Sequence, residues 1–139
     1  MQFILDELAI GSYEEAQQPP SAIDALLCVA AERDVYPGRC KYHKVPIIDM
    51  QPIPVDQMCN AIEWIDAAVP NHRIMVFCNA GIGRSPSVVV GYLCCVLGYS
   101  FGEAVELVAT RKPYMSILPD LILTIAKAAE QVKISIPEI

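Results

Sequence analysis

The sequence has few basic residues and no long apolar run. Lys and Arg number 10 against 16 Asp and Glu, which gives a formal net charge of -6. Nucleic acid or an anionic membrane surface is bound by clustered basic side chains, so we expect neither partner. No stretch approaches the ~20 consecutive apolar residues that span a bilayer. The opening stretch MQFILDELAIGS has acidic residues where a signal peptide has a basic start, so we expect a cytoplasmic protein.

Cysteine is present, but not in the patterns that hold metals. The 6 cysteines include no CxxC pair, and none is grouped at ligand spacing with either of the 2 histidines. In a cytoplasmic protein these thiols are expected to stay reduced. The sequence therefore predicts neither a metal site nor another cofactor.

The order of the apolar segments predicts an α/β fold. A small hairpin is expected in residues 3–12, ending at a Gly11-Ser12 turn, followed by a short polar helix that Pro19 stops. We expect strands at 23–30, 43–49 and 73–78, and helices at 55–69, 85–97, 100–110 and from 119 onward. This order predicts a small, mainly parallel central sheet flanked by helices. With 139 residues, 54% of them apolar, we expect a single domain over 1–139.

Residues 76–87, VFCNAGIGRSPS, join an apolar strand to a helix through a loop with two glycines. Such a loop turns several backbone N–H groups toward one point, beside the positive end of the helix dipole. That point is an anion site, and it also favours a thiolate, the reactive form of Cys78. Arg84 adds a planar fork for two oxygens of a phosphoryl group, and Ser85 can donate a hydrogen bond to the sulfur. A chance match of all these positions has a probability on the order of 10⁻⁵.

The stretch CNAGIGRS resembles the Cys-x-x-Gly-x-x-Arg-Ser loop of the cysteine-dependent dual-specificity phosphatases, in the protein tyrosine phosphatase superfamily. The resemblance continues in LAIGS, VPIIDM, GYLC and RKPYMSILPD, so it implies one catalytic domain over nearly the whole chain. It implies Cys78 as nucleophile, Arg84 as phosphate clamp and Ser85 as helper of thiolate departure. It also implies a backbone cradle for the phosphate, made by Asn79, Ala80, Gly81, Ile82 and Gly83 together with Arg84.

Asp49 is the predicted general acid. Its position after a strand and its spacing from Cys78 match the acid of the family. The leaving oxygen of a phosphoryl transfer needs a proton, and the same carboxylate can then activate water. Asp56 is the alternative, although it lies where an acid of the first helical turn is expected.

Phe77 departs from the family, which usually has a histidine before the nucleophile that hydrogen-bonds near the loop. Phenylalanine keeps the bulk and loses those bonds. Two interpretations follow: a working enzyme, or a catalytically weak or inactive domain that only binds phosphorylated partners. We favour the enzyme, because a binding domain needs no nucleophile.

The favoured function is a phosphomonoester hydrolase with a cysteinyl-phosphate intermediate. Its expected partner is a phosphorylated protein substrate, with phosphotyrosine first and phosphoserine or phosphothreonine next. A glucan-type phosphatase is a further alternative, because CNAGIGRS also looks like the loop of those enzymes.

Overall fold

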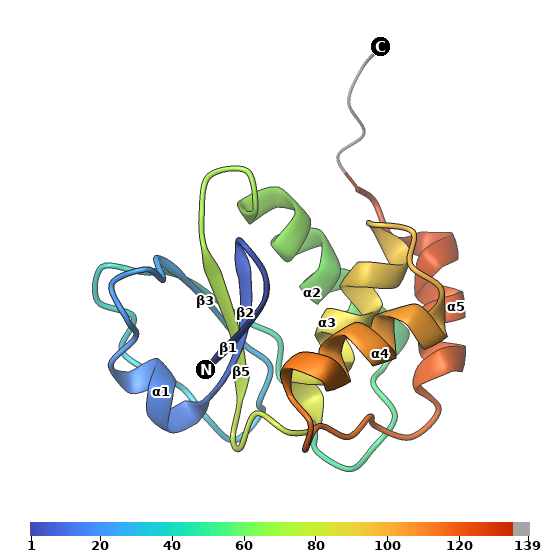
Figure 1. The fold of residues 1–139 in the computed structure, drawn as a ribbon, viewed down its shortest axis with the longest axis horizontal. Coiled ribbons are helices and arrows are strands. Elements are labelled where there is room, and N and C mark those ends of the chain that lie inside the picture. Colours follow the sequence, from blue (N-terminus) through green and yellow to red (C-terminus); the bar gives the residue numbers. More distant parts are fainter. Residues whose placement is uncertain (135–139) are drawn as a thin grey trace.

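Five strands form one sheet in the order β1-β2-β5-β3-β4 in the computed structural model, which describes residues 1–134 (Figure 1). The strands are β1 (Gln2–Leu5), β2 (Leu8–Ser12), β3 (Ala25–Cys28), β4 (Lys41–Lys44) and β5 (Ile74–Cys78). β5 pairs in parallel with β2 and β3, and β3 pairs in parallel with β4, whereas β1 and β2 are antiparallel. The predicted mainly parallel sheet is therefore confirmed. The end of the predicted domain, 135–139, lies outside the described residues.

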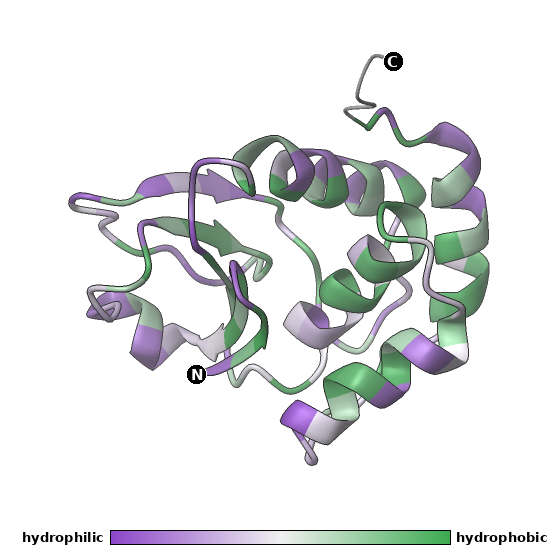
Figure 2. Cartoon of the chain, turned by 45° about the horizontal axis from the view of Figure 1, so that its top comes forward, coloured by the Kyte–Doolittle hydropathy of each residue, from purple (hydrophilic) through white to green (hydrophobic). Residues whose placement is uncertain are grey.

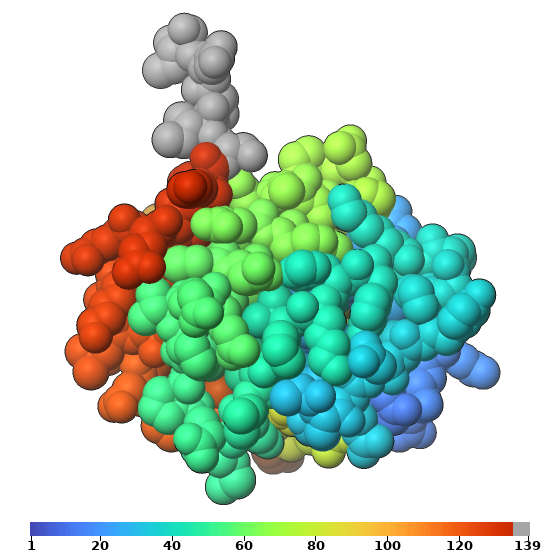
Figure 3. Space-filling view, turned by 180° about the vertical axis from the view of Figure 1, so that it is seen from behind, coloured from blue at the N-terminus to red at the C-terminus, as the bar shows by residue number. Residues whose placement is uncertain are grey.

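The helices cover the two faces of the sheet unequally. They are α1 (Tyr13–Gln17), α2 (Val55–Ala68), α3 (Arg84–Cys95), α4 (Phe101–Arg111) and α5 (Leu121–Gln131). α1 lies on one side of the sheet, and α2 to α5 gather on the other (Figure 1). Seen from behind, α2 lies between α5 and the chain around β4 (Figure 3). α3 is the central helix, since it contacts β5, α2, α4 and α5.

β5 and most of α3 are buried, as is β3. Every residue of β5 is buried, and so are residues 84–93 of α3. A central strand covered on both faces has a continuous apolar run, which explains why this strand is recognisable in the sequence. α2 and α4 instead alternate hydrophobic and hydrophilic residues around each turn, as expected of helices that bury one face (Figure 2). The loop between β5 and α3 is therefore held at both ends by buried elements.

The strand predicted over 43–49 is misplaced. β4 ends at Lys44, because Pro46 has no N–H to continue the ladder and the Ile47 N–H turns back to the Val45 carbonyl at 2.8 Å. Val45 and Ile47 are nevertheless buried, which produced the strand-like pattern. Residues 45–54 thus leave the carboxyl edge of the sheet as irregular chain.

Capping boxes mark the starts of two helices, α1 and α4. Ser100 and Glu103 form a capping box at the start of α4, where a helix is predicted over 100–110. The same arrangement of Ser12 and Glu15 starts α1 directly at the end of β2. The predicted hairpin is present and turns at Asp6 and Glu7, but the turn predicted at its end, Gly11-Ser12, is wrong because the backbone there is still strand.

Candidate active site

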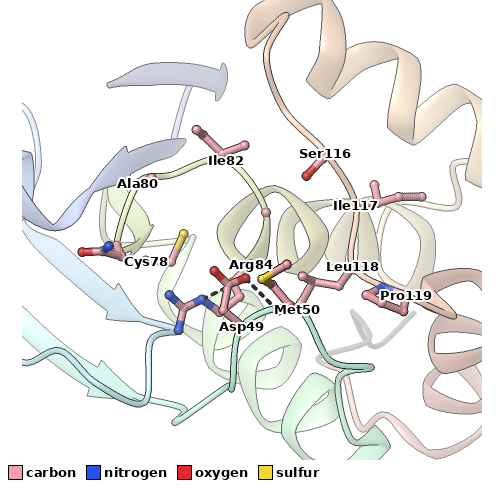
Figure 4. A pocket seen from close by; sticks show the side chains of 12 residues that line it. Asp49, Met50, Cys78, Ala80, Ile82, Arg84, Ser116, Ile117, Leu118 and Pro119 are labelled. Carbon is pink, nitrogen blue, oxygen red and sulfur yellow. Dashed lines mark hydrogen bonds and ion pairs between the residues drawn. The ribbon is translucent and has the colours of Figure 1, made fainter.

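A pocket of about 440 Å³ opens at the carboxyl edge of the sheet, where β5 passes into α3 (Figure 4). Its lining comes from the loop after β5, from the irregular chain after β4 and from the connection between α4 and α5. Cys78, Arg84 and Asp49 all line it. The pocket therefore brings together three of the four side chains that the sequence assigns to chemistry.

Gly81 allows the loop to take its shape. Its φ is +74°, a left-handed conformation that L side chains rarely adopt, and a Cβ there would lie 2.7 Å from the carbonyl oxygen of Gly11. The loop thus lies against the end of β2 with no room for a side chain. Gly83 is different, because its φ is −114° and the nearest atom to a Cβ would be 3.6 Å away.

Three carbonyls of the loop are hydrogen-bonded by neighbouring segments. The Asn79 carbonyl accepts from the Tyr13 N–H at 3.0 Å, and the Ile82 carbonyl accepts from the Ser116 N–H at 2.8 Å. The Gly83 carbonyl accepts from the Ser87 hydroxyl at 2.7 Å. With these oxygens turned outward, the loop can direct its N–H groups at an anion in the pocket.

The N-terminus of α3 adds to the anion site. Gly83 is the N-cap residue, and no side chain caps the helix. The first N–H groups of a helix have no partner within the helix, and the helix dipole places positive charge there. These donors are therefore available to phosphoryl oxygens.

Cys78 ends β5 at the floor of the pocket. Its side chain is buried, and its Sγ lies 3.2 Å from the Ser85 Oγ in the first turn of α3. Ser85 is itself fully buried, so its hydroxyl has a fixed direction. The fourth predicted residue thus contacts the sulfur directly, although it does not line the pocket.

Arg84 is fixed by Glu32, a residue that sequence reasoning missed. The guanidinium is buried and donates to the two Glu32 carboxylate oxygens, from Nη1 at 2.6 Å and from Nη2 at 2.7 Å. Nη1 also donates to the Ile47 carbonyl at 3.1 Å. The hydrogen bond from Arg84 lowers the pKa of Glu32 to about 2, and Glu32 in turn raises the pKa of Arg84. The pair is therefore charged across the physiological range.

This bidentate contact leaves one edge of the fork free for a ligand. Arg84 Nε is buried and has no hydrogen-bond partner, and the Asp49 Oδ1 lies 3.7 Å from it as an ion pair (Figure 4). A buried N–H without a partner is costly unless a ligand satisfies it. The unpaired donor faces the same pocket as Cys78.

The two candidate acids lie in different places. Asp49 lines the pocket and accepts a hydrogen bond from the Met50 N–H at 2.9 Å. Asp56 lies in the first turn of α2, beside a separate shallow hollow with His43 and Asn60. Of the two, only Asp49 reaches the pocket of Cys78.

Phe77 is fully buried in β5, paired with Cys28 of β3. Its ring packs into the core, and the loop after it keeps the braces described above. At the position where the family usually has a hydrogen-bonding histidine, this chain thus has a phenylalanine that packs into the core.

The other cysteines have no comparable surroundings. All six are free thiols. Burial raises the pKa of Cys94, and it raises the pKa of Cys95 to about 11.

Within residues 1–134 no group of three or more His, Cys, Asp and Glu side chains is arranged to hold a metal ion. Nor does any helix in that range have the length and apolar content to cross a membrane.

Sequence comparison gives relatives for most of the chain. The family "Dual specificity phosphatase, catalytic domain" matches residues 10–131. Protein phosphatase Slingshot homolog 1 of Homo sapiens is 30% identical over 118 residues, which is 78% of this chain and 11% of the relative. Dual specificity protein phosphatase 1-A of Xenopus laevis is 30% identical over 120 residues, which is 81% of this chain and 32% of the relative. The chain thus spans only a minor part of these curated relatives.

Solved structures share the fold. Human DUSP28 superimposes with a TM-score of 0.83 at 19% identity, covering 94% of this chain and 96% of that one. Tk-PTP in its active form gives 0.79 at 21% identity with the same coverage of both chains. The family match extends over nearly the whole sequence, and the fold agrees with it. The chain therefore belongs to the dual specificity phosphatase family of the protein tyrosine phosphatase superfamily.

Proposed function

We propose that this chain is a protein phosphatase that hydrolyses phosphomonoesters through a cysteinyl-phosphate intermediate, without a metal ion. The observation that carries the proposal is the meeting of Cys78, Arg84 and Asp49 in one pocket with an uncapped helix N-terminus. A thiol, a cation and a carboxyl group around an anion site are the parts that a two-step phosphoryl transfer needs.

In the first step the Cys78 thiolate attacks phosphorus. The S–P bond forms as the P–O bond to the substrate breaks. The leaving oxygen keeps the electron pair of that bond and receives a proton from the Asp49 carboxyl group. Arg84 Nε and the loop N–H groups hold the non-bridging oxygens, where charge develops in the transition state. Glu32 acts through Arg84, by holding the guanidinium in this orientation.

In the second step water attacks the phosphorus of the cysteinyl-phosphate. The Asp49 carboxylate accepts a proton from this water, the S–P bond breaks, and inorganic phosphate leaves. The Ser85 hydroxyl, 3.2 Å from the sulfur, donates a hydrogen bond to the departing thiolate. The enzyme returns to its starting state with Asp49 protonated.

The proposed substrate is a phosphorylated protein, with phosphotyrosine and then phosphoserine or phosphothreonine as the reacting residues. The dual specificity phosphatase family supports this class. A domain that only binds phosphorylated partners is less well supported, because Cys78 lies against Ser85 and shares its pocket with Asp49. Glucan phosphate is a weaker candidate, because no observation on the pocket favours a sugar.

The test is steady-state hydrolysis of p-nitrophenyl phosphate in the presence of a chelator. We expect turnover by the unmodified chain and a loss of at least about 10³-fold in Cys78→Ser, because a serine hydroxyl is a much weaker nucleophile than a thiolate. Rapid quenching with ³²P-labelled substrate should trap labelled protein in Asp49→Asn and none in Cys78→Ser. Absence of turnover in the unmodified chain would support the binding domain instead.

A further inference from the structure

We propose that Met50, Ile82 and Ile117, here called the apolar rim, select phosphoprotein segments with apolar side chains next to the phosphorylated residue. This inference rests on the proposed function and narrows its substrate class. The three residues come from the three different segments that line the pocket. They therefore surround the path by which a peptide reaches Cys78.

The apolar rim is unusually exposed for its residue types. Met50 has 82% of its surface exposed, and Ile82 and Ile117 have 42% and 41%. The fold buries most of its other large apolar side chains. Scattered exposed apolar residues need no explanation, but three around one catalytic pocket indicate a surface that a ligand covers.

The backbone beside the pocket is strained at Met50, one of the three rim residues. Among the described residues only Met50 and Asp120 are non-glycine residues with positive φ, at 61° and 56°. Met50 lines the pocket, and Asp120 follows the lining residue Pro119. A left-handed conformation is unfavourable for an L residue. Strain of this kind concentrates at ligand sites, where the direction of a side chain matters.

The direction of Met50 follows from the proposed chemistry. Asp49 has to reach the leaving oxygen, so the substrate residue that carries this oxygen lies beside the Asp49 carboxyl group. Met50 is the next residue, and its N–H is bonded to that same carboxyl group. Figure 4 shows Ile82 and Ile117 on different sides of the pocket, with Met50 near Asp49. An extended chain advances only about 3.3–3.6 Å per residue, so the residues on either side of the phosphorylated one lie at the apolar rim.

The charges at the pocket are already used. The free edge of Arg84 is assigned to the phosphate and Asp49 to the leaving oxygen, so neither is available for a charged neighbour of the phosphorylated residue. Arg33 is a basic residue that contacts the loop. It donates a hydrogen bond to the Asn79 side chain and lies over the Tyr13 ring, so it already has partners. A charged side chain buried at the apolar rim would lose water without gaining a partner.

The rim is also attached to the catalytic loop. The Ser116 N–H donates to the Ile82 carbonyl at 2.8 Å, and the Leu118 N–H donates to the Ser87 hydroxyl at 3.0 Å. Ile117 lies between these two bonds. Its backbone is therefore fixed relative to the phosphate site, so a preference at this position can affect kcat/KM.

The experiment compares four phosphotyrosine peptides that differ only in the two residues flanking the phosphotyrosine: leucine, alanine, glutamate or lysine. We expect kcat/KM for the leucine peptide to exceed that for the glutamate and lysine peptides by roughly tenfold. In Met50→Glu and Ile117→Glu the leucine-to-lysine ratio should fall to about one or invert. Leu97→Glu is the matched control, because Leu97 is 45% exposed just after α3 and does not line the pocket. Its ratio should stay at that of the unmodified chain.

Three outcomes separate this inference from the proposed function. Equal kcat/KM for all four peptides, with p-nitrophenyl phosphate still hydrolysed, overturns the apolar rim alone. Hydrolysis of p-nitrophenyl phosphate without hydrolysis of any peptide overturns the phosphoprotein substrate as well. If nothing is hydrolysed, the proposed function fails, and the affinities of Cys78→Ser for the four peptides by fluorescence anisotropy decide on the rim. Equal affinities would overturn it.

Discussion

The loop that holds the phosphate site and the chain that carries Asp49 are built in opposite ways. The loop at 79–83 lies between a fully buried strand and a mostly buried helix, and three of its carbonyls are hydrogen-bonded from neighbouring segments. Residues 48–52 are all exposed and belong to no helix or strand. The proposed nucleophile and anion site are thus preformed, while the proposed acid lies on a segment with few fixed contacts. Such a division lets the phosphate bind first and the acid adjust to different leaving groups.

The largest expected effect comes from disturbing the braced loop. Gly81→Ala would place a Cβ 2.7 Å from the Gly11 carbonyl at a φ of +74°, so the loop or β2 has to shift. We expect kcat/KM to fall by about 10²-fold or more, since small displacements of a reacting group cost that much. Hydrolysis of p-nitrophenyl phosphate measures it.

Gly38→Ala is the control for the strain itself. Gly38 also has a positive φ, +56°, but a Cβ there would have no neighbour within 4 Å. It should cost about 1 kcal/mol of stability and leave kcat/KM unchanged. Equal activity losses for both variants would show that close approach to β2 does not shape the loop.

The exposed segment is tested next, through Asp49→Asn. We expect hydrolysis of an alkyl phosphate or phosphoserine peptide to slow by about 10²-fold, because an alkoxide leaves poorly without a proton. Hydrolysis of p-nitrophenyl phosphate should slow by less than about tenfold, since its leaving group needs little protonation. Asp56→Asn should change neither rate. Similar losses on both substrates would remove Asp49 from the acid role.

A smaller effect is expected from Glu32→Gln, which weakens the support of Arg84. The amide keeps the size of the side chain and loses its charge, so one of the two charge-assisted bonds to the guanidinium is lost. We expect roughly a tenfold decrease in kcat/KM and weaker competition by vanadate. Asp34→Asn, two residues further on and bonded to Lys44, should leave both unchanged. Unchanged vanadate affinity in Glu32→Gln would show that Arg84 needs no positioning.

The smallest effect concerns stability in acid. The pKa of Glu32 is lowered from 4.5 to about 2 in the folded chain, so its ion pair contributes fully above pH 4.5 and is lost as pH falls toward 2. Because the Glu32 side chain is 50% exposed, solvent screening limits the contribution to about 1 kcal/mol. Urea unfolding between pH 6 and pH 3 should show a smaller decline in Glu32→Gln than in the unmodified chain. Parallel declines would place the acid sensitivity elsewhere.

The best-buried parts of the molecule were predictable from sequence. A continuous apolar strand, a loop with Gly81 and a long apolar helix each have a pattern that one stretch of sequence contains. The strand at 43–49 was not predictable in this way, because burial of Val45 and Ile47 imitates a strand while Pro46 removes the hydrogen bond that defines one. Local pattern thus reports burial more reliably than pairing.

Glu32 was missed because its partner is distant in sequence. It follows the end of β3, and Arg84 follows the end of β5, its parallel neighbour in the sheet. The carboxyl ends of adjacent parallel strands meet at one edge, so an acid shortly after one strand can reach a base after the next. This rule could have nominated Glu32 once the strand order was known, and strand order is what the sequence alone left open.

The hydroxyl of Ser87 has a consequence for how such a protein can diversify. It donates to the Gly83 carbonyl and accepts from the Leu118 N–H, so one buried atom joins the start of α3 to the chain beside the rim. The backbone around Ile117 is therefore held by the Ser87 hydroxyl, and not by the Ile117 side chain. The residue at position 117 can be exchanged through mutation while the backbone that carries it keeps its course. Related proteins with this architecture can acquire new substrate preferences by single substitutions at the surface, while the residues that carry out the reaction stay unchanged.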